Sequence, residues 1–97
     1  MAEANSKKPL AVLLLERINQ RIDWLNESIL HGRGSPSAFD FVRDSIQADF
    51  ALLVQASDFT TETMRGHEGL VRAVIRNLYA RHFNGEARHL ETLFPEV

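Results

Sequence analysis

The sequence predicts an all-α protein, an antiparallel three-helix bundle followed by a short C-terminal fourth helix. Apolar residues recur at helical steps over three long stretches, breaker residues separate these stretches, and no segment shows strand-type alternation. The chain has 97 residues, 44% of them hydrophobic and 25% charged, a composition typical of one globular domain. We expect a flexible polar tail at 1–8 and a single helical domain at 9–97.

The first predicted helix, 9–31, has the most regular pattern. Pro9 suits its first position, where the missing N–H is not needed, and Gly32 suits its C-terminal cap. Six apolar residues follow at alternating steps of four and three, as in a helix that buries one face; they are Ala11, Leu15, Ile18, Ile22, Leu25 and Ile29.

The second predicted helix, 36–56, begins after the strongest breaker in the chain, 32–36. Gly32 and Gly34 permit left-handed backbone, Ser35 is a good N-cap, and Pro36 suits the first helical position. A tight turn between antiparallel helices follows. The predicted buried stripe is Phe39, Val42, Ile46, Phe50 and Leu53.

The third predicted helix, 60–84, follows a chain reversal at 57–61, where capping residues gather. Its stripe is Met64, His67, Val71, Val74 and Leu78. Gly66 and Gly69 weaken its first turns, so it begins either near Thr60 or near His67. Asn84 and Gly85 should end it, and the fourth helix, 86–94, stops before Pro95.

Catalytic and metal-binding motifs are missing from the sequence. It contains no cysteine, which excludes disulfides, thiolate zinc sites and cysteine nucleophiles. A zinc-protease motif starting at His67 fails because Val71 stands where its second histidine belongs. Glycine-rich phosphate loops and the serine-hydrolase elbow are also absent. We therefore predict no enzyme activity, no catalytic residue, no cofactor and no metal.

Two side-chain groups were weighed as sites and interpreted as structural. His82, Glu86 and His89 would share a face as metal ligands on one continuous helix, but the expected break at 84–85 separates them. Asp40, Asp44 and Glu62 would need a pocket to act as acid and base. Asp40 in particular suits the first turn of a helix, where negative charge is favourable.

Charge is segregated along the chain behind a net charge of −2. Residues 32–64 carry a net −3 and residues 65–89 a net +3. The basic-face candidates on the third helix are Arg65, Arg72, Arg76 and Arg81. They either meet the acidic face of the second helix, within a monomer or across a dimer, or bind nucleic acid. The small negative total favours the first interpretation.

The first helix carries more apolar surface than a three-helix monomer needs. Trp24 is either an interface residue or a core residue covered by Leu90, Leu93 and Phe94 of the last helix; surplus apolar area and tryptophan are typical of interfaces. The interface candidates are Leu10, Leu14, Ile18, Ile22, Trp24, Leu25 and Ile29.

These observations predict a non-enzymatic helical protein–protein interaction module, such as a small adaptor, inhibitor, immunity-type or chaperone-type protein. The expected partner is a second copy bound through the first helix, forming a homodimer, or a further protein. The alternative is a nucleic-acid-associated regulator that uses the arginine-rich face. The polar first residues and the short apolar run at 10–15 predict neither a membrane helix nor a signal peptide, and we expect a cytoplasmic protein.

Overall fold

The computed structural model describes residues 8–94, and all regular secondary structure in this range is helical. The five helices are α2 (Leu10–Leu30), α3 (Pro36–Gln55), α4 (Thr61–Arg65), α5 (Glu68–Ala80) and α6 (Asn84–Glu91). The predicted all-α bundle is confirmed.

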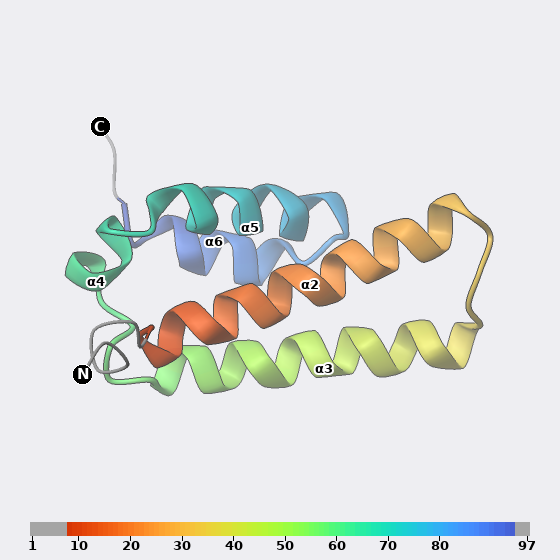
Figure 1. Ribbon diagram of the computed structural model, residues 1–97, viewed down its shortest axis with the longest axis horizontal. Helices are drawn as coiled ribbons and strands as arrows, with labels where there is room; N and C mark the ends of the chain where they lie inside the picture. Colours follow the sequence, from red (N-terminus) through yellow and green to blue (C-terminus); the bar gives the residue numbers. More distant parts are fainter. Residues whose placement is uncertain (1–7, 95–97) are drawn as a thin grey trace, which may run out of the picture.

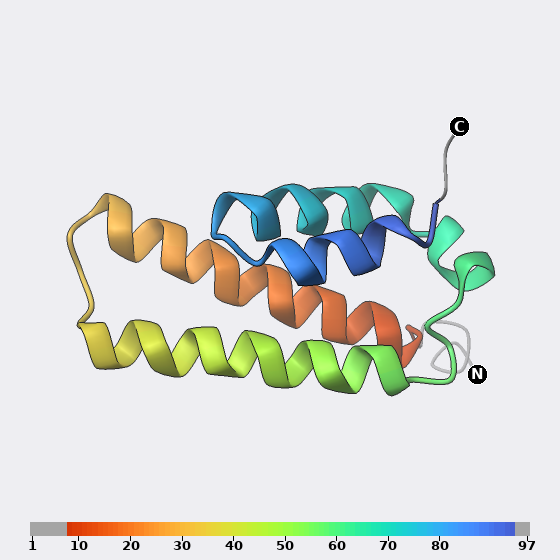
Figure 2. The ribbon, with the colours of Figure 1, turned by 180° about the vertical axis from the view of Figure 1, so that it is seen from behind.

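Two long helices and two shorter ones form the bundle. α2 and α3 run antiparallel as a hairpin, and α5 with α6 forms a second pair that packs on α2 (Figure 1). α2 packs directly against α5, and α6 packs on α5 and is seen in front when the molecule is viewed from behind (Figure 2). The second pair is shorter, with 13 residues in α5 and 8 in α6, against 21 in α2 and 20 in α3. The far end of the hairpin therefore extends past α5 and α6 (Figure 1).

Both ends of α2 are capped by groups outside the helix. At the start, the Asp58 carboxylate accepts hydrogen bonds from the backbone N–H groups of Leu10 (2.8 Å) and Ala11 (3.1 Å). These N–H groups have no partner within a helix, so a carboxylate there stabilises the first turn. At the end, Gly32 takes φ 64° while Arg33 N–H donates to the Ser28 carbonyl at 2.7 Å. This is the predicted glycine cap.

The turn into α3 also follows the prediction. The Ser35 hydroxyl accepts from the Ala38 N–H at 3.2 Å, and Pro36 opens the helix. Gly34 has φ 89°, and a Cβ there would lie 2.8 Å from the Phe39 ring. The positive φ favours glycine at position 34, and a Cβ there would require the Phe39 ring to shift.

The predicted third helix is two helices. α4 ends at Arg65 and α5 begins at Glu68, with Gly66 between them. α5 then ends at Ala80, before the predicted Asn84–Gly85 cap, and Asn84 starts α6 instead.

The earlier end of α5 has a clear hydrogen-bonding cause. His82 takes φ 70°, His82 N–H donates to the Tyr79 carbonyl, and Phe83 N–H donates to the Leu78 carbonyl at 2.8 Å. This is the Schellman pattern, with the buried Phe83 and Leu78 supplying its usual apolar contact.

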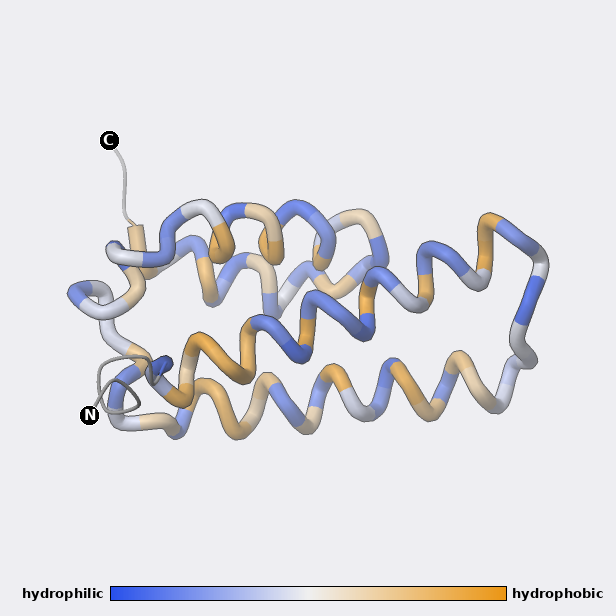
Figure 3. Tube along the Cα trace, in the orientation of Figure 1, coloured by the Kyte–Doolittle hydropathy of each residue, from blue (hydrophilic) through white to orange (hydrophobic). Residues whose placement is uncertain are grey.

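The core lies between the hairpin and the α5–α6 pair and takes residues from α2, α3, α5 and α6. Apolar residues recur along these helices (Figure 3). Of the six predicted seam residues on α2, five are buried and Ile29 is 48% exposed. Ile29 lies on the same side of α2 as the others, but on the part of the hairpin that extends beyond α5 and α6. The fully buried large side chains are Val12, Leu15, Ile18, Ile22, Leu25, Ile46, Leu53, Met64, Val71, Val74, Leu78 and Leu90.

Candidate functional site

A buried carboxylate joins the two helices of the hairpin. The side chain of Asp49 on α3 is 5% exposed, and its two oxygens accept from Arg17 Nη2 and Arg21 Nε on α2, each at 3.1 Å. Burial of a carboxylate is unfavourable unless cations and hydrogen bonds compensate it, and the two arginines supply both. Asp49 of α3 is therefore buried as an ion pair with Arg17 and Arg21 of α2.

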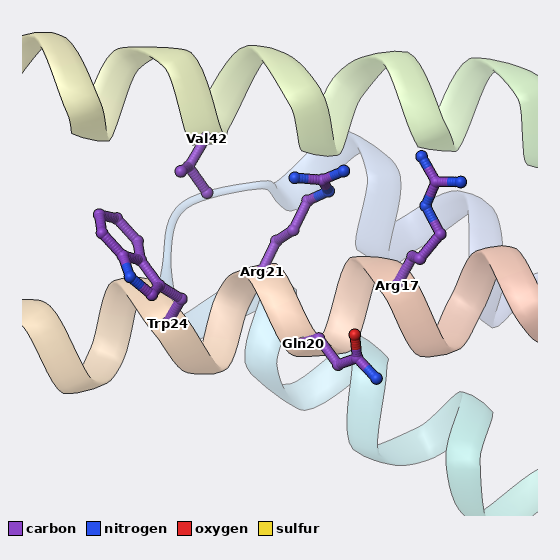
Figure 4. A pocket seen from close by; sticks show the side chains of 5 residues that line it. All are labelled: Arg17, Gln20, Arg21, Trp24 and Val42. Atoms are coloured by element: carbon purple, nitrogen blue, oxygen red, sulfur yellow. The ribbon is translucent and has the colours of Figure 1, made fainter.

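A groove runs between α2 and α3 past this ion-pair cluster. Arg17, Gln20, Arg21, Trp24 and Val42 line a cavity of about 360 Å³. Both arginines and Trp24 project from α2 toward α3, whereas Gln20 points away from it (Figure 4). Trp24 thus stands at one end of the groove, opposite Val42, and the arginines stand at the other.

A second hollow of about 270 Å³ adjoins the groove on the far side of Trp24. It is lined by Trp24, Glu27, Ser28, Arg33 and Gly34. Trp24 is 41% exposed, and its ring meets the Phe39 ring edge-on, with 6.0 Å between centroids. Trp24 therefore forms a ridge between two hollows, held in place by an aromatic contact.

Exposed apolar side chains flank the groove on both helices. On α3, Val42 and Asp49 face the groove, whereas Arg43 contacts Phe83 on the α6 side. With about 3.6 residues per turn, Phe41 and Leu52 lie roughly 60–100° around α3 from Val42 and Asp49, on the side opposite Arg43. They are 67% and 55% exposed.

The matching residues on α2 are Leu13 and Trp24, which are 44% and 41% exposed. Because the helices are antiparallel, Leu13 lies at the level of Leu52, and Trp24 lies at the level of Phe41. The surface formed by Leu13, Arg17, Gln20, Arg21, Trp24, Phe41, Val42 and Leu52 is called the hairpin face below.

The seven predicted interface residues fall into two groups. Leu14, Ile18, Ile22 and Leu25 are at most 4% exposed and belong to the core of this chain, so their assignment to an interface is corrected. The buried seam of α2 packs against the protein's own helices. Leu10, Trp24 and Ile29 are 41–55% exposed and remain available to a partner. Trp24 packs on Phe39, and not under the last helix as the alternative interpretation had it.

The four predicted basic-face residues do not share one helix. The break at Gly66 puts Arg65 on α4, while Arg72 and Arg76 lie on α5. Arg72 pairs with Glu68 at 2.6 Å, and its guanidinium lies 5.4 Å from the centroid of the Phe94 ring. Arg81 lies at the C-terminal cap of α5 and is half-buried. The interruption therefore separates Arg65 from Arg72 and Arg76, which still share one face of α5.

The histidines and carboxylates weighed from the sequence are not brought together. His82 lies in the turn before α6 and His89 on α6, where its ring stacks on Phe59 with 6.0 Å between centroids. Across residues 8–94, no three histidine, aspartate or glutamate side chains gather as metal ligands. Asp40, Asp44 and Glu62 are exposed.

Two parts of the site were not found from the sequence. The link from Arg17 and Arg21 to Asp49 spans 28–32 residues and leaves no local signal. Phe41 and Leu52 did leave one, because both are apolar and lie off the buried stripe of their helix.

Comparisons with protein-family models, curated proteins and solved structures found no match to this chain. Within residues 8–94, no helix is long and apolar enough to cross a membrane.

Proposed function

We propose that the protein is a non-enzymatic protein–protein interaction module that forms a homodimer through the hairpin face. The observation that carries this proposal is the placement of four exposed apolar side chains, Leu13, Trp24, Phe41 and Leu52, on one side of the hairpin. Large apolar side chains grouped on one surface are typical of a site of association.

The spacing of these residues supports a twofold contact. Leu13 and Trp24 are eleven residues apart on α2, and Phe41 and Leu52 are eleven apart on α3. Eleven residues of helix span roughly 16 Å, so the face has an apolar group at each end and the arginines between them. A twofold axis through its centre would bring each apolar end onto the opposite end of the second copy, a self-complementary contact.

The area of the hairpin is sufficient for such a contact. A helix of 21 residues is roughly 32 Å long, and two packed helices are roughly 20 Å wide. The hairpin face therefore offers roughly 640 Å² per copy, which reaches the low end of the range for specific interfaces. Arg17 on the face and the exposed carboxylates of Asp23 and Glu27 elsewhere on α2 supply charges of both signs, which allow attraction between copies.

The test is the mass of the protein in solution. Light scattering during size-exclusion chromatography should give twice the chain mass for the wild type at micromolar concentration. Leu52→Asp should give the monomer, because an aspartate at one apolar end of the hairpin face would be buried against apolar side chains of the second copy. Since Leu52 is 55% exposed in the single chain, the variant should keep its helical circular dichroism.

Leu30→Asp is the matched control. Leu30 is 75% exposed and lies at the end of α2, outside the hairpin face, so this variant should remain a dimer. A wild type that stays monomeric at roughly 100-fold higher concentration would overturn the proposal. Equal loss of the dimer in both variants would show that the hairpin face is not the contact surface.

A further inference from the structure

We infer that the groove of the hairpin face is a binding pocket for an organic carboxylate attached to an apolar group. The pocket is the cavity of about 360 Å³ between α2 and α3. It has a cationic end, formed by Arg17 and Arg21, and an apolar end, formed by Trp24 and Val42 (Figure 4). A ligand that fills it must carry both characters.

The cationic end has unused hydrogen-bonding capacity. Within residues 8–94, Arg17 and Arg21 each donate one hydrogen bond, in both cases to Asp49. A guanidinium carries five donors, so several remain on each side chain. Two cations facing one carboxylate also leave one positive charge in excess. The buried Asp49 holds both guanidinium groups in position before any ligand arrives.

The charge favours a carboxylate over a phosphate. A single carboxylate neutralises the one excess positive charge, whereas a phosphate monoester carries about two negative charges at neutral pH and would leave one unpaired beside Asp49. The planar guanidinium fork also matches the two oxygens of a carboxylate. A monoanion bound by two hydrogen bonds is therefore the best fit at this end.

The apolar end of the pocket favours an aromatic or aliphatic group on the ligand. The indole of Trp24 is fixed by its edge-on contact with Phe39, and Val42 faces it across the groove. An aromatic or aliphatic group placed there gains contact area with two side chains that need not move. The cavity volume falls in the range of small-ligand sites.

Trp24 reports directly on the pocket because it is the single tryptophan of the chain. We would titrate the protein with phenylacetate and follow tryptophan fluorescence, with acetate, inorganic phosphate and benzyl alcohol as comparison probes. Phenylacetate should give a saturable change with a dissociation constant of about 1 mM, as expected for a ligand of this size. Acetate and benzyl alcohol each lack one half of the ligand and should bind at least roughly tenfold more weakly.

Variants of Arg17 test the cationic end. Arg17 is more exposed than Arg21, with 55% of its side chain open, so Arg17→Gln should leave the fold intact and weaken phenylacetate binding at least roughly tenfold. Arg17→Lys keeps the charge and should recover part of the affinity. Arg76→Gln is the matched control, because it removes the same charge from an exposed site on α5 and should leave binding unchanged.

Three results would overturn the inference. The first is no saturable change at phenylacetate concentrations about twentyfold above the expected constant. The second is equal affinity for phenylacetate and inorganic phosphate, which would show that the apolar end of the pocket does not contribute to binding. The third is equal weakening by Arg17→Gln and Arg76→Gln, which would reduce the effect to overall charge.

The pocket and the dimer are tested separately by titrating the Leu52→Asp variant. Leu52 does not line the cavity, so this variant should bind phenylacetate even when it is monomeric. Because the dimer would cover the groove, the monomeric variant decides the pocket. No ligand binding by folded Leu52→Asp would defeat the pocket alone, and a wild type that is monomeric and binds the ligand would defeat the dimer alone. A capped Asp–Phe dipeptide is a further probe, which tests whether the bound carboxylate belongs to a protein segment or to a free organic acid. Tighter binding of the dipeptide than of phenylacetate indicates a protein segment, and the reverse indicates a free organic acid.

Discussion

Replacing Asp58 with alanine should measure how much the long-range cap of α2 contributes to stability. Asp58 lies between α3 and α4, yet its two carboxylate oxygens accept from the N–H groups of Leu10 and Ala11, 47–48 residues earlier in the chain. The substitution removes an acceptor for two N–H groups that no helical carbonyl can serve. It also removes a negative charge from the positive end of the helix dipole.

The expected loss follows from these two contributions. Removing a capping side chain typically costs about 1 kcal/mol, and removing a favourable charge from a helix N-terminus costs about 0.3–1 kcal/mol more. We expect Asp58→Ala to lower the free energy of unfolding by about 1.5 kcal/mol. For a chain of this size, that corresponds to a fall in Tm of roughly 9 °C.

Urea and thermal unfolding followed by circular dichroism would measure the change. Asp58→Asn keeps one side-chain oxygen as an acceptor but loses the charge, so it should recover about half of the loss. Asp44→Ala, at an exposed position on α3, should stay within about 0.5 kcal/mol of the wild type. If Asp58→Ala matches Asp44→Ala, the carboxylate does not cap α2, and the account of this helix end is wrong.

Two further predictions concern the α5–α6 pair. His82 is exposed and has a φ of 70°. His82→Gly should therefore raise the free energy of unfolding by about 0.5 kcal/mol, whereas His82→Ala should not. Equal stability of the two variants would argue against backbone strain at this turn. The hydrogen bond to Glu91 raises the pKa of Tyr79 above its ordinary 10.0. The stabilisation that this hydrogen bond gives the folded state is therefore present below pH 10 and is lost as the pH rises through the raised pKa. An absorbance titration of this single tyrosine should show the shift, and an unchanged pKa in Glu91→Gln would contradict it.

The parts of the fold that local pattern determines were predicted from the sequence. The seam of α2 and the Ser35 cap depend on residues a few positions apart, and both are confirmed except for Ile29, which is exposed. The end of α5 was misplaced because His82 adopts a conformation in which glycine or asparagine is usual, and Asn84 with Gly85 offered a more conventional signal two residues later. Burial of Phe83 determined the outcome.

The candidate site was predicted less completely, because it depends on contacts between distant residues. Trp24 was predicted as an interface candidate from its type and its position off the seam, and it is 41% exposed. Which apolar residues of α2 stay exposed depends on how far α5 and α6 extend along it, and Ile29 shows that this length is not encoded in the local pattern of α2. The pairing of Arg17 and Arg21 with Asp49 likewise required the register of α2 against α3.

Because the two helix pairs differ in length, the far end of the hairpin should open more readily in the native state than the rest of the molecule. Between residues 26 and 45, the far end of the hairpin contains one buried residue, Ser28, whereas Ile18 and Ile22 are completely buried. Little apolar contact is lost when this end opens, so its amide hydrogens should exchange with solvent through local opening, well before the core unfolds. A partner that covers the end would slow that exchange between residues 26 and 45 and leave the rates at Ile18 and Ile22 governed by global unfolding.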